Sequence, residues 1–309
     1  MSTVVIGTRG SALALWQAQH VAAKLGAAHP GLSVRIEIIK TTGDKILDVP
    51  LARVGGKGLF VKEIEEALSA RRIDLAVHSL KDVPATLPPN LEIGAVCARE
   101  DPRDAWLSRL GQRFAETPVG ARVGTSSLRR ESQLRALRPD LSLEPLRGNV
   151  DTRLRKLEEG RYDAVVLAAA GLRRLGLGNR IQETLPPEVM LPAIAQGALG
   201  IEIREDDRTS RELLAPLHDR ATAACVGAER AFLRRLGGGC QVPIAGHATL
   251  AGDRLCLRGL VAWPDGHALV RGERTGGATE AEAIGHALAE ELLRRGADRI
   301  LKALQGGVD

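Results

Sequence analysis

Cysteine is scarce and scattered in this chain of 309 residues, and that scatter argues against two kinds of site. The cysteines Cys97, Cys225, Cys240 and Cys256 form no CxxC pair, as a disulfide framework or a zinc site would require. The histidines show no HExxH or comparable ligand spacing. We therefore expect no bound metal, and we interpret all the cysteines except Cys240 as small core residues.

Aromatic residues are also few, at one Tyr, three Phe and three Trp. Nucleic-acid-binding proteins use aromatic platforms to stack bases, and this chain has too few for that purpose. Its formal net charge of +5 nevertheless favours an anionic partner, and the basic residues are spread through loops instead of forming a basic arm. The composition predicts a small polyanion as ligand and no nucleic acid.

Long apolar runs are absent, so no membrane-spanning segment is expected. The first residues read as the start of a strand and not as a signal peptide, which predicts a cytoplasmic protein. The length is sufficient for two or three domains.

The N-terminal part has an alternating strand and helix pattern with polar turns. A short strand around Val4–Ile6 ends in a turn that contains Arg9 and Ser11, and Ser11 is a plausible N-cap of the following helix. Such a turn is a common place to bind an anion on backbone N–H groups. A capped turn with an exposed arginine is the alternative.

A second polar region follows the predicted strand Ile73–Val77. Lys81 and Asp82 lie just beyond the carboxyl end of this strand, where open α/β sheets bind ligands, although a surface ion pair would look the same. The loop from Thr41 to Lys57, before a predicted helix at Leu59–Arg71, is long and rich in glycine, which indicates function or mobility.

A further strand and helix series begins after the charged break at Glu100–Asp104. Strands at 122–124, 141–146 and 163–167 each lead to a turn with arginine near a helix start. Hydroxyl N-caps are expected at Thr125, Ser127 and Thr152. The helix macrodipole disfavours arginine at an N-terminus, so the repetition indicates a bound polyanion in a cleft between two α/β lobes.

After the second series, the sequence predicts a return to the first sheet and then a different order of elements. Residues 198–203 read as a strand that crosses back to the first lobe's sheet, and a helix at Arg220–Leu236 leads to three glycines and Cys240. Three strands, near 244–250, 254–263 and 268–274, precede a helix at Thr279–Leu304. A cysteine on such a loop can be a nucleophile, a metal ligand or an attachment point. The alternative is that Cys240 simply belongs to the cap of the preceding helix.

Motifs along nearly the whole chain resemble those of the porphobilinogen deaminase family, the hydroxymethylbilane synthases. They are Gly7–Arg9, Leu13–Gln17, Thr42–Asp44, Val54–Phe60, His78–Pro84, Gly124–Arg130, Leu146–Asn149, Gln196–Ala198 and Gly238–Pro243. Each motif alone is weak, and all of them in order are highly specific. Gly10 and Ala12 depart from the residues expected in relatives.

The resemblance implies two α/β lobes like type II periplasmic binding proteins, with hinge crossings, and a small C-terminal α+β domain. The implied domains are residues 1–99 with 197–217, 100–196, and 218–309. It also implies a dipyrromethane cofactor joined to Cys240 by a thioether. Four porphobilinogen units are added to this cofactor with loss of ammonia, and hydrolysis releases the linear tetrapyrrole.

The resemblance also assigns site residues. Implied contacts to the cofactor come from Cys240, Lys81, Asp82, Ser127, Arg129, Arg130, Arg147 and Gly171. Implied contacts to carboxylates of the growing chain come from Arg9, Ser11, Thr125, Arg153, Arg174 and Gln196. Asp44, Lys57 and Phe60 would belong to an active-site loop.

The resemblance further implies that Asp82 is the catalytic carboxylate. It would stabilise the cation left by loss of ammonia and exchange protons with the amine and the ring carbon. We expect a monomer that passes its product to uroporphyrinogen-III synthase. Two other readings are a binding module for organic anions, which the two lobes alone would support, and a nucleic-acid binder, which rests only on net charge.

Overall fold

The computed structural model describes residues 3–45, 60–238 and 242–305. Its contacts divide the chain into two compact units, each described here by itself. The first unit is Met1–Glu100 with Gly197–Ala223, and the second is Asp101–Gln196 with Ala224–Asp309. The division into three domains stays a prediction.

The first unit is built on a sheet with the strand order β2-β1-β3-β10-β4. Its strands are β1 (Thr3–Thr8), β2 (Ser33–Ile38), β3 (Leu75–Ser79), β4 (Leu91–Val96) and β10 (Leu199–Arg204). Strands β2, β1 and β3 are parallel, and β10 runs antiparallel between β3 and β4. The prediction that the segment 198–203 returns to the first sheet is confirmed.

Helices α1 (Ala12–Ala28), α4 (Lys62–Ser69) and α8 (Arg208–Leu214) pack on this sheet, and α2 (Thr42–Lys45) is a single turn. Ala18, Val21 and Leu25 of α1 are fully buried in one cluster with the sheet residues Ile6, Leu75 and Ile201. Burial of this stripe stabilises the helix far more than its propensity does.

The second unit contains a sheet of the same topology, with the order β7-β6-β8-β5-β9. Its strands are β5 (Asp104–Ser108), β6 (Arg122–Gly124), β7 (Ser142–Glu144), β8 (Ala164–Ala168) and β9 (Glu183–Leu185). Strands β7, β6 and β8 are parallel, and β5 is antiparallel to β8 and β9. Helices α5 (Leu128–Leu137), α6 (Val150–Glu158) and α7 (Ala169–Arg174) follow the parallel strands.

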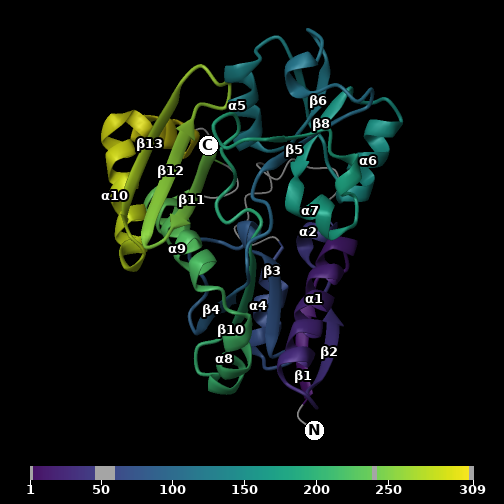
Figure 1. The fold of residues 1–309 in the computed structure, drawn as a ribbon, viewed down its shortest axis with the longest axis vertical. Coiled ribbons are helices and arrows are strands. Elements are labelled where there is room, and N and C mark those ends of the chain that lie inside the picture. The colour runs from purple at the N-terminus through teal and green to yellow at the C-terminus, as the bar shows by residue number, and fades with distance from the viewer. Residues whose placement is uncertain (1–2, 46–59, 239–241, 306–309) are drawn as a thin grey trace. The chain divides into compact units, whose positions relative to one another are not determined.

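The C-terminal part of this unit is a meander of β11 (Ile244–Ala251), β12 (Arg254–Ala262) and β13 (Leu269–Gly277). Helix α9 (Arg220–Arg235) precedes it, and α10 (Ala281–Leu292) covers one face of the sheet (Figure 1). The expected fold class, two α/β lobes with a small α+β domain, is confirmed.

Two details of the helices differ from expectation. The single helix predicted at Thr279–Leu304 is wrong, because a wide turn at Leu293–Ala297 separates α10 from α11 (Asp298–Gln305) and Gly296 there has a φ of 105°. Thr152 does not cap α6. Asn149 is the cap, and its side chain accepts a hydrogen bond from the Thr152 N–H at 2.9 Å.

Three other caps were expected, and of these Ser11 is confirmed, Ser127 lies at the cap position without a side-chain capping bond, and Thr125 is wrong because it does not lie at the cap position. Ser11 caps α1, and its side chain accepts from the Ala14 N–H at 3.3 Å. Ser127 starts α5, but its side chain makes no capping bond, and Thr125 Oγ1 accepts from the Ser127 N–H instead. Among the described helices, none is long and apolar enough to cross a membrane.

The hairpin turn between β12 and β13 packs directly on helix α5. Gly266 in this turn has a φ of +75°, and a Cβ there would lie 2.6 Å from the Ser132 carbonyl oxygen. Gly252, in the turn between β11 and β12, has a φ of +60° but open space around it. The two glycines therefore share a left-handed backbone and differ in the space that a Cβ would have.

This pair gives a direct test of the packing between the C-terminal sheet and α5. Gly252→Ala is expected to cost about 1 kcal/mol in the free energy of unfolding, from the left-handed backbone alone. Gly266→Ala is expected to cost about 2 kcal/mol more, because the methyl group overlaps backbone atoms. Urea unfolding of both variants measures the difference, and equal losses would contradict the contact.

Candidate active site

In the first unit, the parallel strands bring two predicted turns to the same edge of the sheet. Arg9 and Ser11 follow β1, and Lys81 and Asp82 lie in the short helical turn Leu80–Asp82 that follows β3. A pocket forms at this edge. Its lining includes Arg9, Ser11, Gln17, Phe60, His78, Ser79 and Asp82.

The side chains of this pocket are held by specific contacts. The Arg9 guanidinium lies over the Phe60 ring, 4.3 Å from its centroid, an attractive cation–π geometry. The buried amide of Gln17 donates to Ser79 Oγ at 2.7 Å. Asp82 itself is exposed and Lys81 is half-buried. The pocket thus combines a fixed cation, hydroxyl groups and an accessible carboxylate.

A buried group of titratable side chains that sequence reasoning missed includes the pocket residue His78. His78 Nε2 and Glu202 Oε2 are 2.9 Å apart, and both side chains are almost fully buried. Glu65, on α4, is also buried. The pKa of Glu65 is raised to about 7, mainly by burial and then by the negative charge of Glu202, while His78 opposes the increase.

In the second unit, three predicted turns meet at one edge for the same geometric reason. Strands β7, β6 and β8 are parallel, so the residues after them lie along one side of the sheet. Thr125 and Ser127 follow β6, Arg147 follows β7, and the buried Gly171 lies in α7 after β8. Strand β5 begins at this edge, because its first residue, Asp104, pairs with Ala168.

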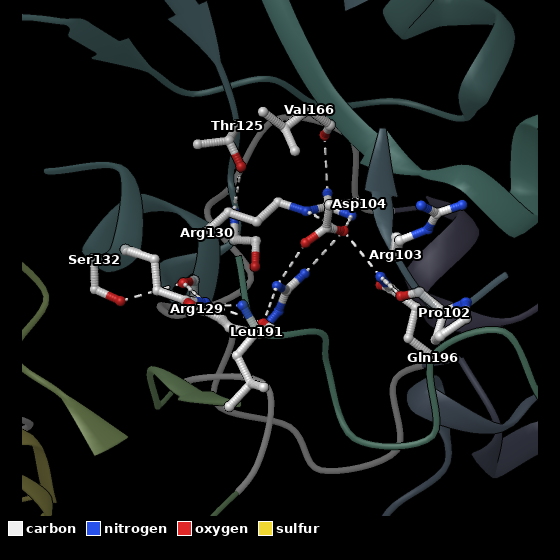
Figure 2. A network of polar contacts seen from close by, with 12 residues as sticks. Pro102, Arg103, Asp104, Thr125, Arg129, Arg130, Ser132, Val166, Leu191 and Gln196 are labelled. Atoms are coloured by element: carbon white, nitrogen blue, oxygen red, sulfur yellow. Dashed lines mark hydrogen bonds and ion pairs between the residues drawn. The ribbon is translucent and has the colours of Figure 1, made fainter. Parts of the chain in front are cut away.

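Asp104 organises the strongest polar network at this edge (Figure 2). Arg129 Nη1 donates to Asp104 Oδ2 at 2.7 Å, and Arg129 Nη2 donates to Oδ1 at 3.2 Å. Arg130 donates to Oδ1 through Nε and Nη2, at 3.1 and 2.8 Å. The Asp104 side chain is completely buried, and the arginine side chains are 6% and 7% exposed.

Backbone carbonyl groups complete the network. Arg129 Nη1 also donates to the Leu191 carbonyl at 2.9 Å, and Arg130 Nη1 donates to the Val166 carbonyl at 2.9 Å. Both guanidinium planes are therefore held at two points. Removing one partner of such a buried pair costs about 3–5 kcal/mol, because the remaining charge is left uncompensated.

The charges of the network do not cancel. Burial alone would raise the pKa of Asp104, but the two guanidinium charges hold it far below its usual range. Burial lowers the pKa of Arg129, and Asp104 opposes that change. With Asp104 ionised, two positive charges face one negative charge, so the group keeps a net charge of +1.

This finding corrects one step of the sequence argument. The arginines at the start of α5 were expected to need a bound polyanion to offset the macrodipole, yet Asp104 supplies much of that compensation. The argument fails for α7 as well, because Arg173 and Arg174 lie in its last turn, where the dipole favours a cation.

The remaining predicted residues divide into three groups. Arg147 and Arg153 are half-buried near the start of α6, and Arg153 Nε donates to the Gly148 carbonyl at 2.8 Å. Gln196 is fully buried, and its amide nitrogen donates to the Pro102 carbonyl at 2.7 Å and to Asp104 Oδ1 at 2.9 Å. Cys240 and Lys57 lie outside the described residues, and only the backbone of Asp44, in α2, is described.

The described residues next to Cys240 are tightly placed. A Cβ on Gly238 would lie 2.2 Å from Ile244 Cδ1, so the chain passes close to the start of β11 on its way into this loop. Only glycine fits this approach without a shift of Ile244.

Among the described residues, no group of three His, Cys, Asp or Glu side chains could hold a metal ion.

Comparisons with known proteins match nearly the whole chain. Residues 4–212 match the family model "Porphobilinogen deaminase, dipyromethane cofactor binding domain", and residues 223–294 match "Porphobilinogen deaminase, C-terminal domain". A relative named porphobilinogen deaminase from Syntrophotalea carbinolica is 61% identical over 98% of this chain and 96% of its own. Relatives of the same name from Syntrophobacter fumaroxidans and Chromobacterium violaceum are 60% and 55% identical, over 97% and 98% of both chains.

The raised pKa of the buried Glu65 carboxyl group leads to a testable dependence of stability on pH. Its pKa of about 7 in the folded protein exceeds the ordinary value of 4.5, so the folded state holds this proton more tightly than the unfolded state. Stability contributed by this proton is present below about pH 4.5 and is lost as the pH rises to about 7.

Glu65→Gln removes this loss, so the variant should gain up to about 3 kcal/mol over the unchanged protein at pH 8 and little at pH 4.5. Urea unfolding at both pH values measures the gain. Glu66→Gln, which changes an exposed neighbour, serves as the control. A gain for Glu65→Gln that does not vary with pH would refute the assignment.

Proposed function

This chain belongs to the porphobilinogen deaminase family, and we propose that it condenses four porphobilinogen units on a dipyrromethane held by Cys240. Each addition releases ammonia, and hydrolysis then releases the linear tetrapyrrole hydroxymethylbilane. The chain is thus a transferase of tetrapyrrole and haem biosynthesis.

The observation that supports this proposal most directly is the arginine pair fixed on Asp104. Each pyrrole of the product bears an acetate and a propionate, so the growing chain is a polyanion. Arginine binds carboxylates in a bidentate manner, which fixes position as well as charge. A buried pair with a net positive charge and a fixed orientation suits a ligand of this kind better than a diffuse basic surface does.

The donor groups of the second unit fit the dipyrromethane. A guanidinium has five N–H donors, and Arg129 and Arg130 each use three of them on described partners, which leaves two on each. These donors, with Arg147, Ser127 and Gly171 of the same unit, would hold the cofactor's carboxylates and rings. Lys81, in the first unit, stays a predicted cofactor contact. When bound, the cofactor supplies the pyrrole carbon on which the chain grows.

Asp82 performs the proton chemistry in this proposal. As the C–N bond of porphobilinogen breaks, the nitrogen leaves with the electron pair and takes a proton from the Asp82 carboxyl group, and positive charge develops on the methylene carbon. A carboxylate at that point stabilises the charge. The same carboxylate then accepts the proton that the ring carbon loses when the new C–C bond has formed. The exposed position of Asp82 at the pocket leaves its oxygens accessible.

Other predicted residues bind the carboxylates of the substrate and the growing chain. These are Arg9, Ser11, Thr125, Arg153 and Arg174. Gln196 is better explained as a support for Asp104, since its amide nitrogen is engaged there. The loop with Asp44, Lys57 and Phe60 would cover the reacting groups during turnover.

The cellular setting is part of the same proposal. We place the protein in the cytoplasm as a monomer, with porphobilinogen as substrate and uroporphyrinogen-III synthase as the recipient of its product. The absence of a membrane-spanning helix from the described residues is compatible with this setting.

Replacing Asp82 tests the mechanism. Asp82→Asn keeps the size and exposure of the side chain but removes its charge, so turnover is expected to fall at least 100-fold with little change in thermal stability. Ammonia release and formation of the tetrapyrrole product measure turnover. Asp206→Asn changes another exposed aspartate of the same unit and should leave turnover intact. Near-normal turnover in Asp82→Asn would rule out this role.

A further inference from the structure

We propose that Asp104 is a positioning residue for the carboxylate-binding arginines, acting through the orientation of Arg129 and Arg130 and not through substrate contact. The inference rests on the proposed function, because it assigns Asp104 a role in binding the dipyrromethane. Nothing in the sequence motifs singles Asp104 out.

The first argument is geometric. Asp104 Oδ1 accepts from both arginines and from the Gln196 amide, and Oδ2 accepts from Arg129 (Figure 2). One carboxylate therefore fixes the relative orientation of two neighbouring guanidinium groups. Without it, each long side chain would keep a single hydrogen bond to the part of the chain that the structure describes, to the carbonyl of Leu191 or of Val166.

The second argument concerns which donors Asp104 takes. It accepts from Arg129 through Nη1 and Nη2, and from Arg130 through Nε and Nη2. On each arginine, two N–H groups then have no partner among the described residues. Bidentate capture of a carboxylate needs two N–H groups at a defined angle. Asp104 both selects these donors and holds them still.

The third argument concerns the support of Asp104 itself. It is the first residue of β5, where its backbone pairs with Ala168, and Gln196 links it to the Pro102 carbonyl. Leu191, whose carbonyl holds Arg129, is fixed by Gln133 through bonds of 2.8 and 3.1 Å. The partners of the two arginines are therefore themselves fixed, Asp104 by strand β5 and Leu191 by its bonds to Gln133, as a precise binding site requires.

Positioning and simple attraction predict opposite results when the acid is removed. Asp104→Asn raises the net charge of the group from +1 to +2. If charge alone binds the polyanion, the variant should bind it better. If Asp104 acts through orientation, the variant should bind it worse despite the additional positive charge.

The test uses cofactor loading, which can be read without an activity assay. Apoprotein of the unchanged chain and of Asp104→Asn is incubated with porphobilinogen, and the fraction that carries the covalent adduct is followed by intact mass. We expect loading of the variant to be at least threefold slower at equal folded concentration. The isolated loaded variant should also show at least a fivefold higher KM for porphobilinogen, with a smaller change in kcat.

A matched control is Asp140→Asn. Asp140 binds Arg138 through two hydrogen bonds, and Arg138 also donates to two backbone carbonyls, so the arrangement is similar but lies away from the edge. This variant should load and turn over at the unchanged rate. Loading of Asp104→Asn at or above the unchanged rate, with an unchanged KM, would overturn the inference.

A second comparison applies if Asp104→Asn does not fold. Arg130→Gln leaves Arg129 paired with Asp104, so the net charge of the group is zero. Arg130→Gln combined with Asp104→Asn leaves Arg129 without the carboxylate, so the net charge is +1, as in the unchanged protein. Orientation predicts slower loading of the double variant than of Arg130→Gln, whereas attraction predicts faster loading and would overturn the inference. Absence of any adduct on the unchanged protein would instead refute the proposed function.

Discussion

A single buried carboxylate, Asp104, sets the arrangement of the polar edge of the second unit. It binds two arginines that would otherwise repel each other in a dry environment, and the two positive charges keep it ionised there. Because one negative charge faces two positive ones, the network keeps a net positive charge. In the function that we propose, the bonds that hold this edge together also orient the arginines toward the carboxylates of the ligand.

The strand order explains why such groups collect where they do. In both five-stranded sheets, three parallel strands end at one edge, and an antiparallel strand begins there. Strand β5 brings Asp104 to the edge of its sheet, and β10 begins opposite Ser79 at the edge of the other. The segment before β10 adds Gln196 and Leu191 to the arginine network. The same segment is bonded to the C-terminal part of the unit. The Ala195 N–H donates to Glu229, and the Pro192 carbonyl accepts from the Gly246 N–H.

Much of this could be predicted from the sequence, for identifiable reasons. Short apolar strands followed by polar turns predicted the parallel strands, the turns that carry arginine and the return of β10. The family motifs then indicated the roles of the residues in these turns. Asp104 was missed because β5 is an antiparallel strand within a charged segment, so its first residue resembled part of a domain break. Glu65 and Glu202 were missed because an acidic residue on a helix or strand reads as exposed, and only tertiary packing buries it.

The central claim is that this chain holds a covalent polyanion on Cys240 with arginines that its own fold has oriented. Intact mass of the purified protein, measured beside Cys240→Ser, tests it most directly. The account predicts an excess mass of two linked pyrrole units on the unchanged protein and none on the variant. A bare polypeptide mass that does not change after incubation with porphobilinogen would contradict it.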